Sequence, residues 1–237
     1  MGRSALTQFY QGYNMDYGET RDRLFEGLEV VMKAWKNETF SHAGQYWTFN
    51  DVTVVPKPYQ QPHPLTRVAA LSADTFPLIG SMGYPTFLLS GRGIDYLEEQ
   101  MKEYRRAYRE AGHTSPDDVL LRIPAYVGET AERAYSEPKY STMHQQAYNA
   151  RVLAGFQVTE EARHQARARA TVSYDEMIEQ RLIFGTPEAV ADRLQEYKER
   201  LGLSGFILEV NHGGQIPNEL VVNSMKLLAE KVFPKVK

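Results

Sequence analysis

Four short apolar runs, separated by amphipathic stretches, dominate the chain after residue 65. Runs of this length are typical of strands in a parallel sheet that is covered on both faces. They lie at residues 66–71, 86–90, 119–127 and 206–210. Between them apolar positions recur every three or four residues, which predicts helices. Alternating strands and helices indicate right-handed βαβ units, and four such strands are half of a (β/α)₈ TIM barrel. The expected fold is therefore α/β, a partial barrel of about four parallel strands that lacks its first half.

The first 65 residues follow a different pattern. Residues 1–17 carry turn residues without any hydrophobic period, so a loop is expected there. A helix is predicted from about Glu19, because apolar residues then recur on one stripe as far as Trp35. Residues 40–58 alternate and are rich in strand-forming residues, which predicts a small hairpin around Asn50-Asp51.

We interpret the whole chain, residues 1–237, as a single domain with two excursions. The first is the hairpin near residues 40–58. The second is a polar, helix-favouring segment near residues 136–184, which ends where Gly185-Thr186-Pro187 predicts a new helix start.

Composition excludes several classes of protein. A net charge of −3 with mixed signs gives no basic surface for nucleic acid or an anionic membrane. No apolar run approaches the roughly 20 residues that a bilayer span needs. The chain has no cysteine, which excludes disulfides and thiolate metal sites, and the histidines show no metal-ligand spacing with acidic residues. We expect a soluble, cytoplasmic protein without a metal site.

The first strand after residue 65 ends in a turn rich in hydroxyl groups. Ser72 and Thr75 follow the apolar residues Ala69, Ala70 and Leu71, where a helix is expected to begin. Side-chain oxygens and free N–H groups at such a turn can bind phosphate. An ordinary helix cap also explains the same residues and is the simpler interpretation, and the sequence leaves both interpretations open.

His212 lies just beyond the last predicted strand, at the end where (β/α)₈ enzymes carry their sites. An imidazole at this place could hydrogen-bond a cofactor or serve as acid or base. It could also be a loop histidine bonded to backbone. Glu209, inside the strand, could point into a barrel interior or bind a basic side chain of a neighbouring strand.

Taken together, several short motifs in this order resemble the bacterial-luciferase-like flavin monooxygenases. The likeness extends over essentially the whole chain. It is carried by Gly2-Arg3-Ser4, residues 10–14, the helix at 21–35, Pro56-Lys57-Pro58, the strand and turn at 62–75, Gly185-Thr186-Pro187-Glu188 and residues 211–217.

The resemblance implies a cofactor and its ligands. Arg3 and Arg21 look like the two arginines that reach the flavin phosphate, and Ser72 and Thr75 match the family's hydroxyl positions. Residues 69–71 would then lie beside the flavin ring. Guanidinium and hydroxyl donors are suited to a phosphate dianion. The implied activity is oxygenation of a small organic substrate with reduced FMN and O₂, with a flavin reductase as a further partner. Some members of the family use a deazaflavin for hydride transfer instead.

The main departure from the family is length. The chain starts where the family's fourth strand ends, so strands that usually flank the flavin are not among its residues. We expect a truncated or split member, or one that pairs as a homo-oligomer or with a complementing subunit, because bare parallel edges invite association. The competing hypotheses are a flavin-binding scaffold without turnover and an inactive fragment.

Overall fold

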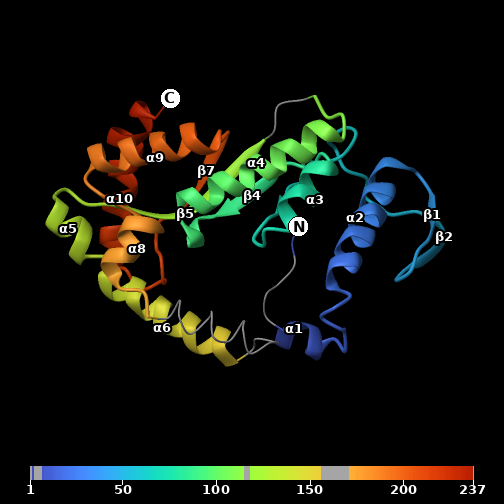
Figure 1. Ribbon diagram of the computed structural model, residues 1–237, viewed down its shortest axis with the longest axis horizontal. Coiled ribbons are helices and arrows are strands. Elements are labelled where there is room, and N and C mark those ends of the chain that lie inside the picture. Colours follow the sequence, from blue (N-terminus) through green and yellow to red (C-terminus); the bar gives the residue numbers. More distant parts are fainter. Residues whose placement is uncertain (1, 3–6, 115–117, 156–170, 237) are drawn as a thin grey trace. The chain divides into compact units, whose positions relative to one another are not determined.

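A computed structural model describes residues 2, 7–114, 118–155 and 171–236 (Figure 1). The chain divides into two compact units, which we call the N-terminal unit (Met1–Arg67) and the C-terminal unit (Val68–Lys237). The single domain expected from the sequence is thus described as two units, each considered by itself. None of the helices within the described ranges has the length and apolarity needed to cross a membrane.

The N-terminal unit consists of two helices and an antiparallel hairpin. Its elements are α1 (Thr7–Gly12), α2 (Thr20–Lys36), β1 (Phe40–Ala43) and β2 (Thr48–Val52). The expected helix is confirmed as α2, which buries Leu28 and Met32. The helix α1 occupies part of the stretch 1–17 where the sequence predicted a loop, so that prediction was wrong for residues 7–12.

The hairpin is confirmed, but its turn is not at Asn50-Asp51. The chain reverses at residues 44–47, where Gly44 N–H donates to the carbonyl of Trp47 at 2.9 Å. Asp51 lies in β2 with a positive φ of 49°, opposite an irregularity in the pairing between Phe40 and His42. The Asn-Asp pair therefore marks a bulge, since residues that tolerate positive φ occur in bulges as well as in turns.

Glu26 of α2 holds the hairpin turn. Its carboxylate accepts hydrogen bonds from the backbone N–H groups of Gln45, Tyr46 and Trp47 at 2.9–3.1 Å. The imidazole of His42, which is buried, also lies 3.2 Å from the same carboxylate. Burial raises the pKa of the Glu26 carboxyl, but these hydrogen bonds outweigh burial, and the net pKa is lowered.

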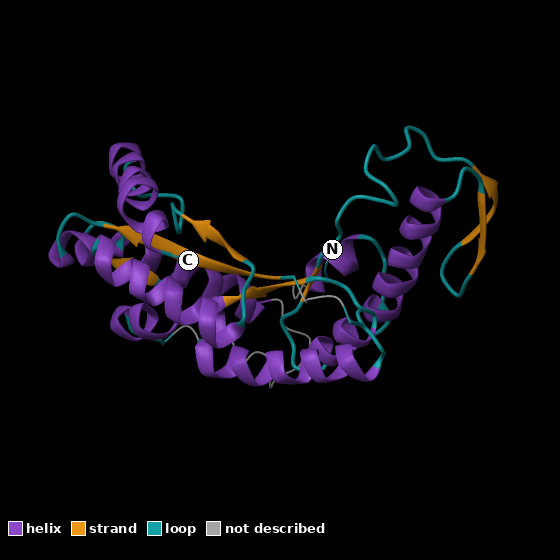
Figure 2. Ribbon diagram, turned by 90° about the horizontal axis from the view of Figure 1, so that it is seen from above, coloured by secondary structure: helices purple, strands orange, loops and turns teal. Residues whose placement is uncertain are grey.

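The C-terminal unit is built on one parallel sheet, seen in orange in Figure 2. Its strands are β3 (Val68–Ala69), β4 (Thr86–Leu89), β5 (Val119–Val127), β6 (Ile183–Gly185) and β7 (Gly205–Glu209). The central strand β5 pairs in parallel with β4, β6 and β7. Because β4 and β7 pair with overlapping stretches of β5, they lie on its opposite edges. The four predicted strands are confirmed, and β6 is a fifth that the sequence analysis missed.

Helices connect these strands as the βαβ pattern requires. They are α3 (Thr75–Ser81), η1 (Ser90–Arg92), α4 (Ile94–Glu110), α5 (Ala131–Ser136), α6 (Lys139–Gly155), α8 (Tyr174–Gln180), α9 (Pro187–Leu201), α10 (Asn218–Leu227), η2 (Leu228–Val232) and η3 (Phe233–Lys235). The start of α9 follows the predicted capping, with Thr186 accepting from Ala189 N–H and Pro187 at the first position. Residues 156–170 of the expected helical excursion lie outside the described residues.

One face of the sheet is buried and the other is partly open. Val68, Leu88, Leu121 and Ile123 on the first face are fully buried, packed beneath the helices. On the second face Leu89 and Glu209 are half-buried, Arg122 is exposed and Ile207 is 41% exposed, although Pro124 is buried. Parallel sheets are normally covered on both sides. The open face is therefore the unusual feature of this unit, and it holds the cavity described next.

Candidate functional site

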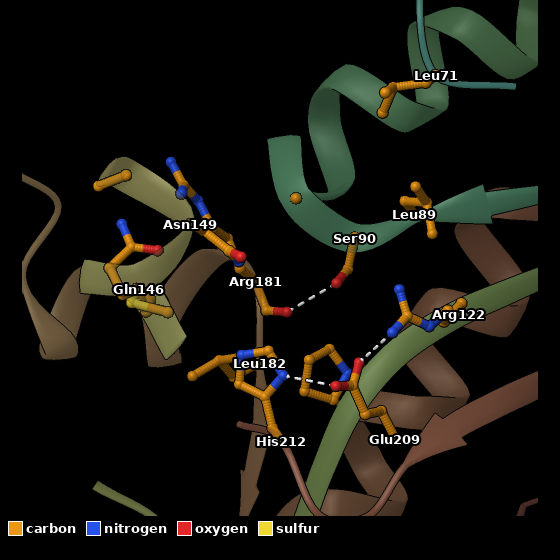
Figure 3. Close-up of a pocket in the computed structure, with 14 residues that line it drawn as sticks. Leu71, Leu89, Ser90, Arg122, Gln146, Asn149, Arg181, Leu182, Glu209 and His212 are labelled. Carbon is orange, nitrogen blue, oxygen red and sulfur yellow. Dashed lines mark hydrogen bonds and ion pairs between the residues drawn. The ribbon is translucent and has the colours of Figure 1, made fainter. Parts of the chain in front are cut away.

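A cavity of about 330 Å³ lies at the carboxyl ends of the strands in the C-terminal unit (Figure 3). The strand residues that line it are Leu89, Arg122, Pro124 and Glu209. They all point to the open face of the sheet, since alternate residues of a strand point to the same side and these four are in register. Helices α6 and α8 and the segment after β4 complete the wall. The lining residues are Leu71, Leu89, Ser90, Gly91, Arg122, Pro124, Gln146, Asn149, Ala150, Met177, Arg181, Leu182, Glu209 and His212.

Three ionisable side chains form a connected row on one side of this cavity. His212 Nδ1 lies 3.0 Å from Glu209 Oε1, and Arg122 donates to Glu209 Oε2 at 2.7 Å. The sheet register explains the ion pair: Arg122 pairs with Ile207, so Glu209 lies two residues further along on the same face. Of the two alternatives weighed for Glu209, the pair with a basic side chain of a neighbouring strand is confirmed, and its place in a barrel interior stays a prediction.

The environment keeps Glu209 ionised. The hydrogen bond with His212 lowers the pKa of the Glu209 carboxyl below its ordinary 4.5, burial opposes this, and the charges of His212 and Arg122 add to the lowering. An ionised carboxylate only accepts hydrogen bonds, so Nδ1 of His212 carries the proton. Nε2 is then the ring nitrogen left to act as acceptor or base, and it makes no hydrogen bond with the residues that the structure describes.

The loop that carries His212 is held by α6. Buried Ser141 donates its hydroxyl to the His212 carbonyl at 2.6 Å and accepts from Gln215 N–H at 2.9 Å. Gly213, with φ of 86°, lies so close that a Cβ there would be 2.2 Å from the Ser141 carbonyl oxygen. Asn211 closes the loop by accepting from Ile216 N–H at 3.1 Å. The imidazole is therefore set on a fixed backbone, although His212 follows a strand rather than belonging to one.

The hydroxyl-rich turn after β3 has the predicted local geometry. The hydroxyl oxygens of Ser72 and Thr75 lie 2.8 Å apart, and α3 begins at Thr75. Leu71 is 46% exposed and lines the cavity, whereas Ala70 is buried on the helix side and Ala69 is half-buried. The turn thus meets the cavity through Leu71.

Neither of the two predicted arginines belongs to the described part of the C-terminal unit. Arg3 lies outside the described residues, and Arg21 lies half-buried in the first turn of α2, in the N-terminal unit. Their proposed role at a phosphate stays a prediction.

Several polar residues of the cavity were not predicted from the sequence. Arg122 could have been found, because it is the one charged residue within the otherwise apolar run at 119–127. Arg181 and Asn149 lie in the polar segment that was treated as an excursion, and no pattern distinguishes them there. Within the described ranges, no group of three histidine or acidic side chains is arranged to hold a metal ion.

Comparison with known proteins gives consistent matches. A family model described as luciferase-like monooxygenase matches residues 1–204. A sulfoquinovose monooxygenase of Agrobacterium fabrum is 26% identical over 86% of this chain and 57% of its own length. An FMNH₂-dependent dimethylsulfone monooxygenase of Pseudomonas putida is 25% identical over 81% of this chain and 55% of its own length. The chain thus spans little more than half the length of these curated relatives.

Solved structures of monooxygenases and of an F420-dependent dehydrogenase also match this chain. Monooxygenase RslO1 from Streptomyces bottropensis matches with a TM-score of 0.76 and 25% identity, over 98% of this chain and 67% of its own. The oxygenating constituent of 3,6-diketocamphane monooxygenase from Pseudomonas putida, in complex with FMN, has a TM-score of 0.76 and 19% identity, covering 100% and 71%. An F420-dependent secondary alcohol dehydrogenase, in complex with an F420-acetone adduct, has a TM-score of 0.68 and 17% identity, covering 93% and 63%.

Proposed function

Because this chain belongs to the luciferase-like monooxygenase family, we propose that it forms a large part of the site of an enzyme that oxygenates a small organic substrate with reduced FMN and O₂. The observation that carries the proposal is the cavity at the strand carboxyl ends, into which the row of His212, Glu209 and Arg122 projects. In (β/α)₈ barrels, the fold expected for the completed sheet, active sites lie at that end of the strands.

The residues present fit a flavin at this place. Ser72 and Thr75 offer two adjoining hydroxyls in the turn whose Leu71 lines the cavity. Leu71, Leu89 and Leu182 give the cavity an apolar wall suited to a planar ring. We assign Arg3 and Arg21 to the phosphate on the family likeness, together with Ser72 and Thr75. The flavin, when bound, supplies the electrons that activate oxygen, while the protein orients the substrate and excludes water.

His212 is the candidate acid or base of the reaction. Its Nδ1–H donates a hydrogen bond to Glu209, so Nε2 is the atom that would take a proton from the substrate or return it. Glu209 is a positioning residue in this scheme, because it fixes the tautomer and the ring orientation, and Arg122 in turn orients Glu209.

The open face of the sheet supports a further part of the proposal. Leu71 and Ile207 are exposed on it by 46% and 41%, which is unusual for a parallel sheet. We assign this face to the interior of a (β/α)₈ barrel that further strands complete, from a second copy of this chain or a complementing subunit. Sedimentation velocity distinguishes a second copy from a complementing subunit, because only pairing of two copies doubles the mass of the isolated chain. A monomer with its partly apolar face inaccessible to a hydrophobic dye would contradict both.

A flavin titration followed by oxygen uptake tests the activity. We expect FMN to bind, with affinity about tenfold weaker in Arg21→Ala, because a hydrogen bond to a charged group is worth about 1–3 kcal/mol. Arg109→Ala, at the exposed end of α4, is the matched control and should bind as the unchanged protein does. With NADH and a flavin reductase, substrate-dependent oxygen uptake should follow.

The same measurements distinguish the alternatives. FMN binding without oxygen uptake would support the flavin-binding scaffold without turnover. Binding of F420 in preference to FMN would support deazaflavin-dependent hydride transfer, which the likeness to an F420-dependent dehydrogenase favours as the second candidate. A chain that binds neither cofactor would contradict the proposal and support the inactive fragment.

A further inference from the structure

Arg181 reaches the cavity from a backbone that is fixed on both sides. It follows α8, where its N–H donates to the Met177 carbonyl at 2.8 Å. Its own carbonyl accepts from the hydroxyl of Ser90 at 2.8 Å, which ties it to the segment after β4. The side chain therefore starts from a defined point between α8 and β6, and Figure 3 shows it at the wall of the cavity.

The guanidinium of Arg181 has no anionic partner within the described part of the chain. Its Nε is buried without a hydrogen bond, and burial lowers the pKa of the group. Glu176 is the carboxylate whose charge affects the Arg181 guanidinium, but it already accepts hydrogen bonds from Ser173 in the capping box of α8. Burying an unpaired cation is costly, so an anion brought to this guanidinium would be stabilised.

The other charges of the cavity are already balanced against one another. Glu209 is shared between Arg122 and His212, at 2.7 and 3.0 Å. Arg181 is therefore the surplus cation among the lining residues, and it leaves the cavity with one net positive charge when His212 is neutral. Leu71, Leu89 and Leu182 make much of the remaining wall apolar.

Asn149 of α6 lines the same cavity and can add a second donor. Its Oδ1 accepts from Gln145 Nε2 at 2.8 Å, and no acceptor among the described residues takes the two N–H groups of its amide. An arginine fork with an amide beside it is suited to an oxyanion group such as a carboxylate or sulfonate.

We propose that Arg181, assisted by Asn149, forms an oxyanion subsite that binds the acidic headgroup of a monoanionic substrate with an apolar body. The inference rests on the proposed function in taking this cavity as the substrate site. It places the headgroup at the part of the cavity wall formed by α6 and the residue after α8. A flavin phosphate carries the same oxyanion chemistry, so the test must separate these two sources.

Binding of two matched probes tests the subsite without turnover. Hexanesulfonate and hexanol are titrated into the full chain by calorimetry, with and without FMN. We expect hexanesulfonate to bind in preference to hexanol, and Arg181→Met to weaken it at least tenfold while hexanol is unaffected. Arg181→Lys should retain part of the affinity, since it keeps the charge without the fork. Asn149→Leu should weaken hexanesulfonate by a smaller factor.

Arg92→Met is the control for the loss of an arginine near the site. Arg92 lies in η1 with its guanidinium over the Tyr96 ring and does not line the cavity, so this variant should bind both probes normally. Circular dichroism checks that each variant is folded. If Arg181→Met does not fold, Asn149→Leu tests the same subsite. Unchanged hexanesulfonate affinity in folded Arg181→Met and Asn149→Leu would overturn the proposal.

Titrations of FMN and riboflavin identify the source of the oxyanion. Arg181→Met should leave both affinities unchanged. A loss for FMN but not for riboflavin would assign Arg181 to the flavin phosphate and overturn the substrate subsite. A chain that binds hexanesulfonate through Arg181 but binds no flavin would retain the subsite and contradict the proposed oxygenase instead.

Discussion

Replacing His212 by glutamine is expected to lower turnover about 100-fold or more, because positioned proton transfer contributes on that order. The variant keeps a polar side chain of similar size but cannot exchange a proton. The measurement is substrate-dependent oxygen uptake with reduced FMN supplied by a reductase, giving kcat and KM separately. Retention of more than half of kcat in a folded variant that binds flavin normally would contradict the role of His212.

The pH dependence of the same reaction separates His212 from Glu209. The lowered pKa of Glu209 means that its carboxylate is ionised above its ordinary value of 4.5 and is protonated only as pH falls through the lowered value. A change in rate between pH 5 and 8 therefore does not come from Glu209. A change in this range that disappears in His212→Gln and remains in Glu209→Gln would assign the exchanged proton to His212. Glu209→Gln keeps an acceptor for Nδ1–H but removes the charge, and a loss of about tenfold is expected.

Two neighbouring glycines provide a variant that moves the imidazole without removing it. An alanine at Gly213 would bring a Cβ to 2.2 Å from the Ser141 carbonyl oxygen, whereas nothing lies within 4 Å of a Cβ at Gly214. Both positions have positive φ, 86° and 73°, so both variants carry similar backbone strain. Gly213→Ala should therefore lose activity beyond Gly214→Ala, since a displacement of about 1 Å can cost about 100-fold. Equal activities would show that the contact with Ser141 does not position His212.

Replacing Glu26 by glutamine is expected to lower the unfolding midpoint of the N-terminal unit by roughly 5–10 °C. The variant cannot accept all the hydrogen bonds that the carboxylate takes from residues 45–47 and His42. The chain has two tryptophans, Trp35 and Trp47, and both lie in this unit. Thermal unfolding followed by tryptophan fluorescence therefore reports on this unit.

Acid should remove the difference in unfolding midpoint between the unchanged protein and Glu26→Gln. The pKa of Glu26 is lowered in the folded state, so its contribution to stability is present above the ordinary value of 4.5 and is lost as pH falls through the lowered value. Melting curves of the two proteins should differ at pH 7 and converge at low pH. Glu29→Gln is the control, because Glu29 is 57% exposed, pairs with Lys33 at the surface and lies 3.9 Å from His42 Nδ1, whereas the hydrogen bonds from residues 45–47 go to Glu26. A midpoint in Glu26→Gln equal to that of the control would contradict the prediction.

The strands of the sheet were predictable because each is a local pattern. Apolar runs bounded by turn residues identify β4, β5 and β7 without knowledge of their partners. The strand β6 has three residues and no pattern of its own, and it forms because residues 183–185 pair with the end of β5. The hairpin turn was misplaced for the same reason: the contacts that hold residues 45–47 come from Glu26, far back along the chain.

For the candidate site, the sequence determined where chemistry could occur but not which groups act together. A histidine just past the last strand, a hydroxyl-rich turn after β3 and the family likeness all follow from local order along the chain. That Glu209 joins His212 to Arg122 depends on the register of β5 with β7. That Arg181 lies in the same cavity, with no anionic partner among the residues that the structure describes, depends on how α8 is held against the segment after β4. Contacts between residues about 90 positions apart arise only from packing, and the tertiary structure alone decided them.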